Sequence, residues 1–267
     1  MTSEPDIKIE IRDLTMAYGS FVVMRDISAN IKRGEIFIIM GGSGCGKSTL
    51  LRHMIGLKEP AQGDVFYDGV PFWKSDEAAR TVKLRTFGVL FQGGALWSSM
   101  TLAENIGLVL GEYTEFPPAE IREIARLKLA LVGLKGFEDY YPAEISGGMC
   151  KRAGLARALA LDPDVLFFDE PSAGLDPISS RNLDELILQL RDSLGATFVV
   201  VTHELASIFT IADNSVFLDP NTRTMRAQGN PRELLKNSTD PAVREFLTSG
   251  NASARPTATK PSIPTNL

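Results

Sequence analysis

The stretch GGSGCGKST, which runs from Gly41 to Thr49, decides how the rest of the chain is interpreted. It satisfies the pattern G-x-x-x-x-G-K-[ST] of a phosphate-binding loop. Glycines let a backbone curl around a polyphosphate without Cβ clashes, and the curled backbone points its N–H groups at the phosphate oxygens. In this pattern Lys47 neutralises phosphate charge, the Ser48 hydroxyl can ligate Mg²⁺, and Thr49 can reach another phosphate. We expect the whole loop to form the phosphate-binding surface: Gly41, Gly42, Ser43, Gly44, Cys45, Gly46, Lys47, Ser48 and Thr49.

The residues on both sides of this loop have the order that the pattern requires. Ile36–Met40 is an apolar run typical of a buried parallel strand. After the loop, Gly56 is placed to end a helix. The apolar residues of that helix recur on one face: Leu50, Leu51, Met54 and Ile55. This order of strand, loop and helix argues against a chance glycine-rich turn.

Composition excludes several classes of protein. The chain has 267 residues, of which 44% are hydrophobic and 23% charged, and these proportions are typical of a globular protein with one large or two modest domains. The net charge of −5 argues against a nucleic-acid-binding protein with a basic surface. No apolar run approaches the ~20 residues of a membrane span. The N-terminal MTSEPDIKIE lacks the pattern of a signal peptide, so any membrane partner is expected to be a separate chain.

The two cysteines, Cys45 and Cys150, are too few and too far apart for a zinc or disulfide framework. Oxidation of Cys45 within the phosphate loop would be damaging, which favours a reducing cytosol. We expect Cys45 to be a small loop residue rather than a redox switch. His53, on the helix that follows the loop, is interpreted as structural or solvated rather than functional.

Hydrophobic patterns predict an α/β fold that begins with antiparallel strands. Apolar residues alternate with polar ones in 7–11 and in 27–31, which predicts two half-buried strands with Tyr18 in a short loop between them. A further short strand is predicted over 64–69. The remaining strands are predicted from apolar runs at 87–91, 165–170, 197–204 and 215–218.

Between 92 and 161 the pattern changes to helices, which predicts a helical insertion in the α/β core. Thr101 and Glu104 form a capping box for the first helix, a double proline at 117–118 opens the second, and Ser146 begins the third. A long amphipathic helix follows and ends at Gly195, and small helices are predicted near 231–236 and 241–247. We expect residues 1–248 to form one domain. Residues 249–267 are rich in Pro, Ser and Thr, which predicts a disordered tail.

Two acidic residues end the apolar run 165–168. A carboxylate at the carboxyl end of a buried strand, beside a phosphate loop, is well placed to hold Mg²⁺, and this is the role expected for Asp169. The next carboxylate, Glu170, can polarise a water for attack on the γ-phosphate. The alternative is that both acids merely end a strand. The phosphate loop in the same chain argues against it.

A second helix start suited to phosphate lies in ISGGMCKR, from Ile145 to Arg152. Ser146 is a natural N-cap, and Gly147 and Gly148 let an anion approach the amides of the first turn. Taken alone, the segment would be interpreted as a plain N-cap with flexible glycines.

Together these motifs resemble those of the ATP-binding cassette (ABC) ATPases, in order and approximate spacing, over 7 to about 218. SGG at 146–148 resembles the family's signature motif, VLFFDE at 165–170 its second nucleotide motif, and SAGLDP at 172–177 its D-loop. The resemblance implies a P-loop NTPase fold of the ABC type, with a RecA-like core, an antiparallel β subdomain and a helical insertion.

Single residues extend this resemblance. Gln92 resembles the Q-loop glutamine and His203 the switch histidine. Tyr18 resembles the aromatic residue that stacks on adenine, although it could be an ordinary loop aromatic.

The resemblance implies a head-to-tail dimer of two copies with two ATP molecules at the interface. In each site the loop Gly41–Thr49 of one copy would bind the phosphates. The signature of the other copy, Ser146, Gly147 and Gly148, would cover the γ-phosphate, and Asp176 would communicate across the dimer.

The same resemblance assigns catalytic and metal roles within an ATPase. Glu170 would be the general base, and His203 would contact the γ-phosphate. Gln92 would sense Mg²⁺ and the attacking water, and would link the site to the helical block. The implied metal site therefore comprises Ser48, Gln92 and Asp169.

Met149 stands where most signatures of the family carry glutamine, and a methionine cannot make the polar contacts of a glutamine. SGGM followed by basic residues, together with FQGGALWSSMTLAENI at 91–106, resembles the ATPases of MCE-type lipid transporters, including the Mla phospholipid-trafficking systems. This implies an integral-membrane permease, an MCE-domain protein and a small regulatory subunit as partners. It places the chain as a peripheral protein at the cytoplasmic face of the inner membrane, with no nucleic-acid partner.

Large apolar residues follow Gln92, and they allow two interpretations. Leu96, Trp97 and Met100 could pack in the core of the helical block, or they could line a groove for a helix of the permease.

The motifs leave four functions open. The first is a motor for phospholipid or another hydrophobic molecule, and the second is a motor for an amino acid, an ion or another small solute. A soluble ABC ATPase acting on ribosomes or DNA is disfavoured because the chain has one cassette and no sustained heptads. A non-hydrolysing regulatory subunit is disfavoured because no catalytic residue is missing.

Overall fold

A six-stranded sheet forms the centre of the computed structural model, which describes residues 6–249. Its strand order is β10-β9-β3-β8-β7-β6, and the neighbours from β9 to β6 run parallel while β10 is antiparallel to β9. The strands are β3 (Ile36–Gly41), β6 (Phe87–Leu90), β7 (Val165–Asp169), β8 (Thr197–Val201), β9 (Asn214–Asp219) and β10 (Thr224–Gly229). The predicted α/β fold with a parallel core sheet is confirmed.

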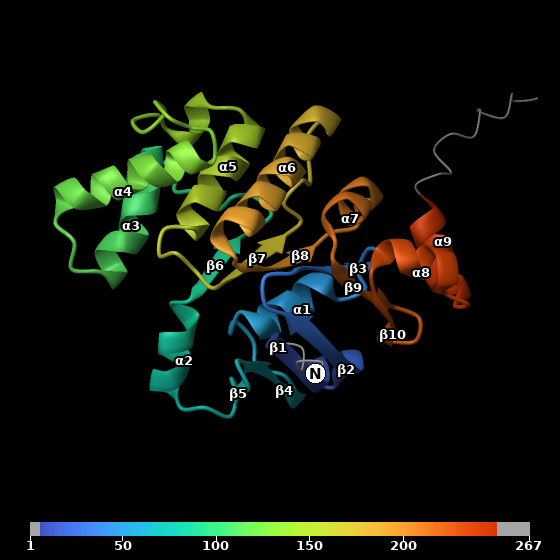
Figure 1. Cartoon of the computed structure of the whole chain (residues 1–267). Coiled ribbons are helices and arrows are strands. Elements are labelled where there is room, and N and C mark those ends of the chain that lie inside the picture. Colours follow the sequence, from blue (N-terminus) through green and yellow to red (C-terminus); the bar gives the residue numbers. More distant parts are fainter. Residues whose placement is uncertain (1–5, 250–267) are drawn as a thin grey trace, which may run out of the picture.

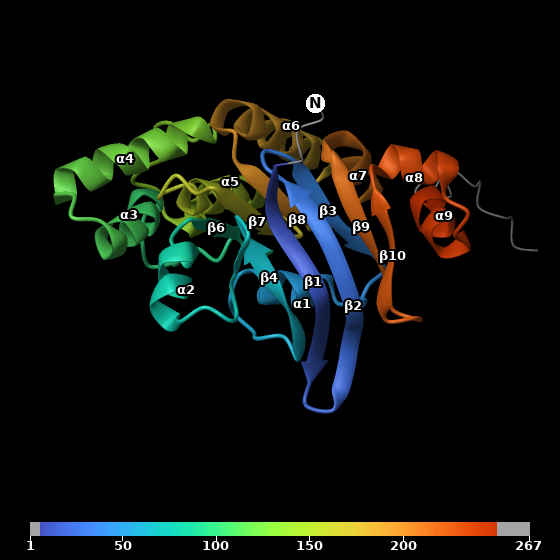
Figure 2. The ribbon, with the colours of Figure 1, turned by 60° about the horizontal axis from the view of Figure 1, so that its bottom comes forward.

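A second, four-stranded antiparallel sheet has the order β2-β1-β4-β5. Its strands are β1 (Ile7–Tyr18), β2 (Phe21–Lys32), β4 (Gln62–Tyr67) and β5 (Val70–Pro71). β1 and β2 form a long hairpin, which Figure 2 shows lengthwise. The loop expected around Tyr18 is shorter than predicted, because β1 continues through Tyr18, which pairs with Phe21, and only Gly19 and Ser20 form the turn.

Helices α3, α4 and α5 occupy the predicted position of the helical insertion, between β6 and β7. The capping box at Thr101 and Glu104 is present, with the Glu104 amide donating to the Thr101 hydroxyl at 3.2 Å. The helices are α1 (Lys47–Met54), α2 (Glu77–Leu84), α3 (Leu102–Tyr113), α4 (Pro118–Leu131), α5 (Gly147–Ala158), α6 (Pro177–Leu194), α7 (Leu205–Ile211), α8 (Pro231–Asn237) and α9 (Pro241–Thr248). A short 3₁₀ turn, Pro142–Glu144, precedes α5.

The six-stranded sheet is buried on both faces. Successive side chains of a strand point to opposite faces, and in β3 the residues Ile36, Ile38 and Met40 pack into one apolar cluster while Phe37 and Ile39 pack into another. The first cluster lies under α5, α6 and α7, and the second faces α1 and the four-stranded sheet (Figure 1).

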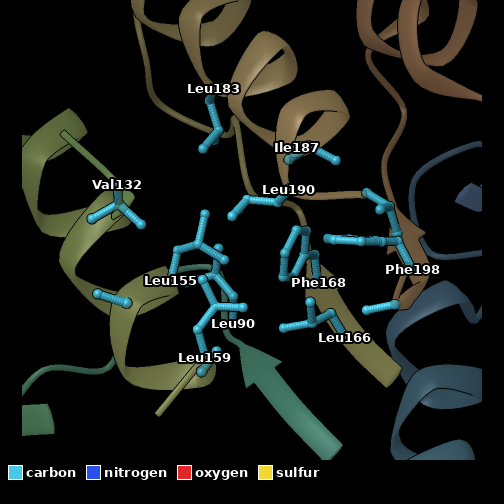
Figure 3. Packing of buried hydrophobic residues seen from close by; sticks show 14 of the residues in the cluster. Leu90, Val132, Leu155, Leu159, Leu166, Phe168, Leu183, Ile187, Leu190 and Phe198 are labelled. Carbon is cyan, nitrogen blue, oxygen red and sulfur yellow. The ribbon is translucent and has the colours of Figure 1, made fainter. Parts of the chain in front are cut away.

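Figure 3 shows how helix and sheet side chains meet in the first cluster. Leu155 and Leu159 of the α5 segment and Leu190 of α6 point toward Leu166 and Phe168 of β7. All five side chains are buried. The packing holds α5 and α6 on the strands whose carboxyl ends carry the candidate site.

Apart from the 3₁₀ turn, three short elements were not predicted: β5, α7 and β10. The N-cap residue of α7, Glu204, makes no side-chain cap bond, so the helix has no start signal in the sequence. In β10 the alternation is weak because it is an edge strand whose side chains are only half-buried or exposed.

The tail predicted over 249–267 lies outside the described residues, apart from Ser249. Across residues 6–249 we find no helix with the length and apolar character needed to cross a bilayer.

Candidate nucleotide-binding site

The phosphate-binding loop connects β3 to α1, as predicted. Gly41 has a φ of 151°, and a Cβ built on it would lie 2.5 Å from the main-chain oxygen of Leu218. Gly46, the N-cap of α1, has a φ of 94°, in the left-handed region that side chains disfavour. Its Cβ would meet Val23 at 3.0 Å. The loop therefore needs glycine at both ends for conformation as well as space.

Lys47 is nearly buried, with 7% of its surface exposed. Its ammonium donates hydrogen bonds to the main-chain oxygens of Gly41 and Gly42, each at 3.1 Å. The same nitrogen lies 4.0 Å from Oε1 of Glu170. A cation is thereby held at the start of α1, where the helix dipole also favours an anion.

Ser48 and Asp169 come from α1 and β7 and meet at the edge of the loop. The Ser48 hydroxyl donates to Oδ1 of Asp169 at 2.8 Å. A hydroxyl and a carboxylate are hard oxygen ligands of the kind that Mg²⁺ prefers, with its other positions taken by phosphate and water. Among residues 6–249 no group of three His, Cys, Asp or Glu side chains forms a metal cluster. By its oxygen donors, the pair of Ser48 and Asp169 fits a magnesium ion that is held jointly with a nucleotide.

Glu170 follows β7 directly and is paired with His203. Its Oε1 lies 2.9 Å from Nδ1 of His203, while Oε2 has no hydrogen-bond partner among the described residues. The backbone of Glu170 has a φ of 50°, an unusual value for a residue with a side chain. β7 and β8 are adjacent, with Asp169 opposite Val201, so the residues that follow both strands lie together.

A cleft of about 420 Å³ brings half of the predicted site residues together. The carboxyl ends of β6, β7 and β8 supply Gln92, Glu170 and His203, as expected where parallel strands end at one edge of a sheet. Val23 of β2 also lines the cleft and was not predicted. The remaining lining residues belong to the loop and the start of α1: Ser43, Gly44, Gly46, Lys47, Ser48 and Thr49.

The signature residues do not line this cleft. Ser146 is the N-cap of α5, and its hydroxyl accepts a hydrogen bond from the Met149 amide at 3.3 Å. Ser146 and Gly148 line a different cavity of about 380 Å³, together with Leu175 and Ser179 of the D-loop and α6. A single chain therefore carries two helix N-termini suited to binding phosphate, and each lines a separate cavity.

Asp176 is the N-cap of α6 and lies beside the signature cavity. Its carboxylate accepts hydrogen bonds from the amides of Ile178 and Ser179, each at 3.0 Å. The hydrogen bond from the Ser179 hydroxyl is the main cause that lowers the pKa of Asp176. In this chain Asp176 thus fixes the D-loop against the start of α6.

Tyr18 does not line the cleft. Its ring is 46% exposed, and the Lys58 ammonium lies over it, 3.9 Å from the ring centroid. The neighbouring side chains of Thr49 and Arg52 lower the pKa of the Tyr18 phenol. Stacking of Tyr18 on adenine remains a prediction, and the Lys58 side chain occupies one face of the ring.

Cys45 and His53 are both buried, at 2% and 0% exposure. Burial raises the pKa of the Cys45 thiol, which keeps it protonated and unreactive. Burial likewise lowers the pKa of His53, whose Nδ1 contacts the Lys58 main-chain oxygen. These environments favour a structural role for each residue.

One buried cation near the site was missed by sequence analysis. Lys151, in α5, is 7% exposed and donates to the main-chain oxygens of Gln92 and Glu170. In the sequence it is one of two basic residues after the signature, where a solvated helix face is the ordinary expectation. No local signal indicates its burial.

Residues 24–173 match a family model described as "ABC transporter". The "Probable ribonucleotide transport ATP-binding protein mkl" of Mycobacterium tuberculosis (strain ATCC 25618 / H37Rv) is 43% identical over 242 residues, which are 90% of this chain and 66% of that protein. The chain thus spans just under two thirds of the length of this relative. The "Intermembrane phospholipid transport system ATP-binding protein MlaF" of Escherichia coli (strain K12) is 38% identical over 239 residues, which are 90% of this chain and 88% of that protein.

Two solved structures extend the similarity to three dimensions. The cbiO1 protein of Clostridium perfringens, described as part of the ABC transporter complex cbiONQ, superposes with a TM-score of 0.80 at 27% identity and covers 93% of this chain and 96% of that chain. A dimeric post-hydrolysis state of the ATP-binding cassette MJ0796, bound to ADP and Pi, superposes with a TM-score of 0.73 at 28% identity. It covers 83% of this chain and 98% of that chain.

Proposed function

This chain belongs to the ABC transporter family of ATP-binding proteins, and we propose that it is the ATP-hydrolysing subunit of a transporter that moves phospholipid or a related hydrophobic molecule. The proposal that the chain hydrolyses ATP is supported by one observation: Lys47, Glu170 and His203 converge in one cleft. A phosphate-binding cation and a carboxylate held by a histidine can together support the attack of water on a γ-phosphate.

In the proposed reaction Glu170 accepts the proton of the attacking water. His203 holds the carboxylate through Oε1, and this contact leaves Oε2 free to take that proton. Lys47 lies within 4.0 Å of the same carboxylate and is placed to neutralise phosphate charge. Ser48 and Asp169 would hold Mg²⁺, which supplies positive charge to the phosphates.

Gln92 has an exposed side chain that faces the cleft from the end of β6. From this position its amide would sense the metal and the attacking water. Because Gln92 also begins the segment that leads into α3, its movement would be transmitted to the helical block.

We infer a head-to-tail dimer from the two separate cavities. The cleft beside Lys47 lacks the signature, and the cavity at Ser146 and Gly148 lacks the phosphate-binding loop. Two copies arranged head to tail would complete both sites, with Asp176 at the junction. The dimeric cassette MJ0796 bound to ADP and Pi supports this arrangement.

A membrane partner is proposed to bind at the segment that follows Gln92. Leu96 packs against the core, whereas Trp97 is 59% exposed and Met100 lines an apolar groove. The groove lies between α3 and α4 and has a volume of about 350 Å³, with Leu108 and Ile121 among its walls. A groove of this kind suits a short helix of a permease. Met100, at the edge of the groove, belongs to the segment that begins at Gln92, and this connection would link permease movement to ATP hydrolysis.

The proposals for the transported molecule and for the partner subunits are based on the relatives. The relative from Escherichia coli is named for intermembrane phospholipid transport, which supports phospholipid as cargo. The mycobacterial relative is named for ribonucleotide transport, which makes a small solute the second candidate. With phospholipid as cargo, the partners would be a permease, an MCE-domain protein and a small regulatory subunit. The chain would then lie at the cytoplasmic face of the inner membrane.

The test is transport by the chain purified together with its membrane partners and reconstituted in vesicles. We expect ATP-dependent movement of a fluorescent phospholipid that is lost in Glu170→Gln. Undiminished ATP-driven transport in that variant would contradict the role of Glu170. Uptake of a radiolabelled ribonucleotide without phospholipid movement would refute the proposal that phospholipid is the transported molecule.

A further inference from the structure

The buried ammonium of Lys151 joins three parts of the molecule. The residue lies in the second turn of α5, the helix whose start carries the signature. Its Nζ donates to the main-chain oxygen of Gln92 and, at 3.4 Å, to that of Glu170. Gln92 and Glu170 occupy equivalent positions, because Leu90 of β6 pairs with Phe168 of β7 and each residue lies two positions after its member of that pair. Lys151 thus bridges two neighbouring strand ends at the edge of the cleft.

Burying the positive charge of Lys151 costs free energy unless the N–H groups of its ammonium form hydrogen bonds. Burial lowers the pKa of Lys151, while the negative charges of Glu204 and Glu170 act in the opposite direction. An uncharged side chain of similar length, such as methionine, would fill the same space without desolvation of an ammonium. Packing alone therefore does not account for a lysine here, whereas the two carbonyl contacts do.

Other contacts fasten the segment after β6 to α5. Arg157 donates to the main-chain oxygens of Gly94, at 3.1 Å, and Ala95, at 2.6 Å. A Cβ on Gly154 would lie 2.9 Å from the Gly94 oxygen, so the two backbones are in close contact. The beginning of the segment and α5 therefore form one unit. Within it, Lys151 is the cation that reaches the residue carrying the reactive carboxylate.

Glu170 depends on such support because its backbone is in an unfavourable conformation. A φ of 50° lies in the left-handed region, which is unfavourable for a residue with a Cβ. Main-chain hydrogen bonds hold it there: the Glu170 amide donates to Val201 at 2.9 Å, and the Glu170 oxygen accepts from the Ala173 amide at 3.2 Å and from Lys151. The Lys151 contact is the bond in this set that comes from the helical block.

We propose that Lys151 is a positioning residue that holds the Glu170 backbone to Gln92 and to the signature helix, so that the carboxylate is aligned for hydrolysis only when α5 is seated. This rests on the proposed role of Glu170 as the general base. Movement of α5, driven from the apolar groove or from the other copy, would reach Glu170 through the Lys151 ammonium. ATP binding, which uses the loop 41–49, would be little affected.

The test compares Lys151→Met with Lys151→Arg in the full chain purified with its membrane partners. Methionine keeps the length and removes the donors, whereas arginine retains a buried cation. We expect Lys151→Met to lower kcat about 10- to 100-fold, the range for a misplaced catalytic group, with the KM for ATP changed less than about threefold. Lys151→Arg should recover most of the lost kcat.

Lys128→Met is the matched control, because Lys128 is also 7% exposed, lies in the helical block and pairs with Asp162 away from the cleft. The melting temperature is measured for every variant. A kcat for Lys151→Met within about twofold of the wild type, or an equal loss in Lys128→Met, would overturn the proposal.

Glu170→Gln separates the two levels of inference. Normal turnover in Glu170→Gln would refute the proposed function itself. Loss of turnover in Glu170→Gln with normal turnover in Lys151→Met would refute only the role of Lys151.

Discussion

Replacing Glu170 by glutamine is expected to stop ATP hydrolysis while ATP binding is kept or strengthened. The substitution preserves the shape of the side chain and removes its charge. A positioned general base contributes about 10²- to 10⁴-fold to a rate, so kcat should fall by this factor. Because Oε2 has no hydrogen-bond partner among the described residues, the loss reflects the missing base rather than a broken network.

The effect on binding follows from the position of Lys47. Its ammonium lies 4.0 Å from Oε1 of Glu170, and two unit charges at that separation interact by about 4 kcal/mol at an effective dielectric constant of ~20. The carboxylate therefore competes with the phosphates for Lys47. Its removal frees the cation for the nucleotide, so the Kd for ATP should stay equal or become smaller.

The assay is phosphate release at steady state for kcat, and titration with a fluorescent ATP analogue for Kd, on the chain with its membrane partners. Glu233→Gln serves as a control, because Glu233 lies in α8 and its side chain is 60% exposed. A distant exposed substitution of this kind should change kcat by less than about twofold. The reasoning is refuted if Glu170→Gln keeps more than half of the wild-type kcat, or if its Kd for ATP rises tenfold.

Three further predictions concern the loop, pH and the core. Gly41→Ala places a Cβ 2.5 Å from a main-chain oxygen, so we expect a loss of about 1–3 kcal/mol in unfolding free energy and weaker ATP binding, measured by denaturation and nucleotide titration. Burial and the charge of Glu204 raise the pKa of Asp184 to about 6, against the hydrogen bond from Ser207 that lowers it. Asp184 therefore binds its proton more tightly in the folded state, and its contribution to stability falls as pH rises from about 4 to about 6. In the Asp184→Asn variant the unfolding free energy should change less between about pH 4 and about pH 6, and at pH 7 it should be higher by about 1–3 kcal/mol. Urea denaturation at several pH values measures this, and a curve unchanged from the wild type would contradict the prediction. Ile187→Ala in the buried face of α6 should cost about 2–5 kcal/mol in urea denaturation, and a cost below about 1 kcal/mol would contradict the packing in Figure 3.

Much of the fold follows from local patterns. The loop 41–49, the antiparallel hairpin and the capping box at Thr101 all carry signals within a few residues, and each was predicted. The elements that escaped prediction have no such signal. Helix α7 lacks a capping side chain, and β10 is an edge strand without a buried face.

The candidate site was predictable where its residues belong to motifs, and not where distant segments meet. Gln92, Glu170 and His203 come together as expected in one cleft. Lys151 was missed because its two partners are 59 and 19 residues away in the sequence. The Lys58 side chain over Tyr18 was missed for the same reason: the contact joins the hairpin to the segment after α1.

The central claim is that each ATP site is built from two copies of this chain, and complementation between disabled copies tests it most directly. One copy carries Lys47→Ala and the other carries Ser146→Arg, each with its own affinity tag, and the mixed complex is purified through both tags. A composite site predicts about half of the wild-type turnover, because one of the two sites then combines an intact loop with an intact signature.

The reverse arrangement places both substitutions in one copy and pairs it with a wild-type copy. Because every composite site then has one disabled half, the account predicts no turnover in this complex. The measurement is steady-state phosphate release from both mixed complexes. No turnover in the first complex and about half of the wild-type turnover in the second would show that each chain completes its own site, and would contradict the account.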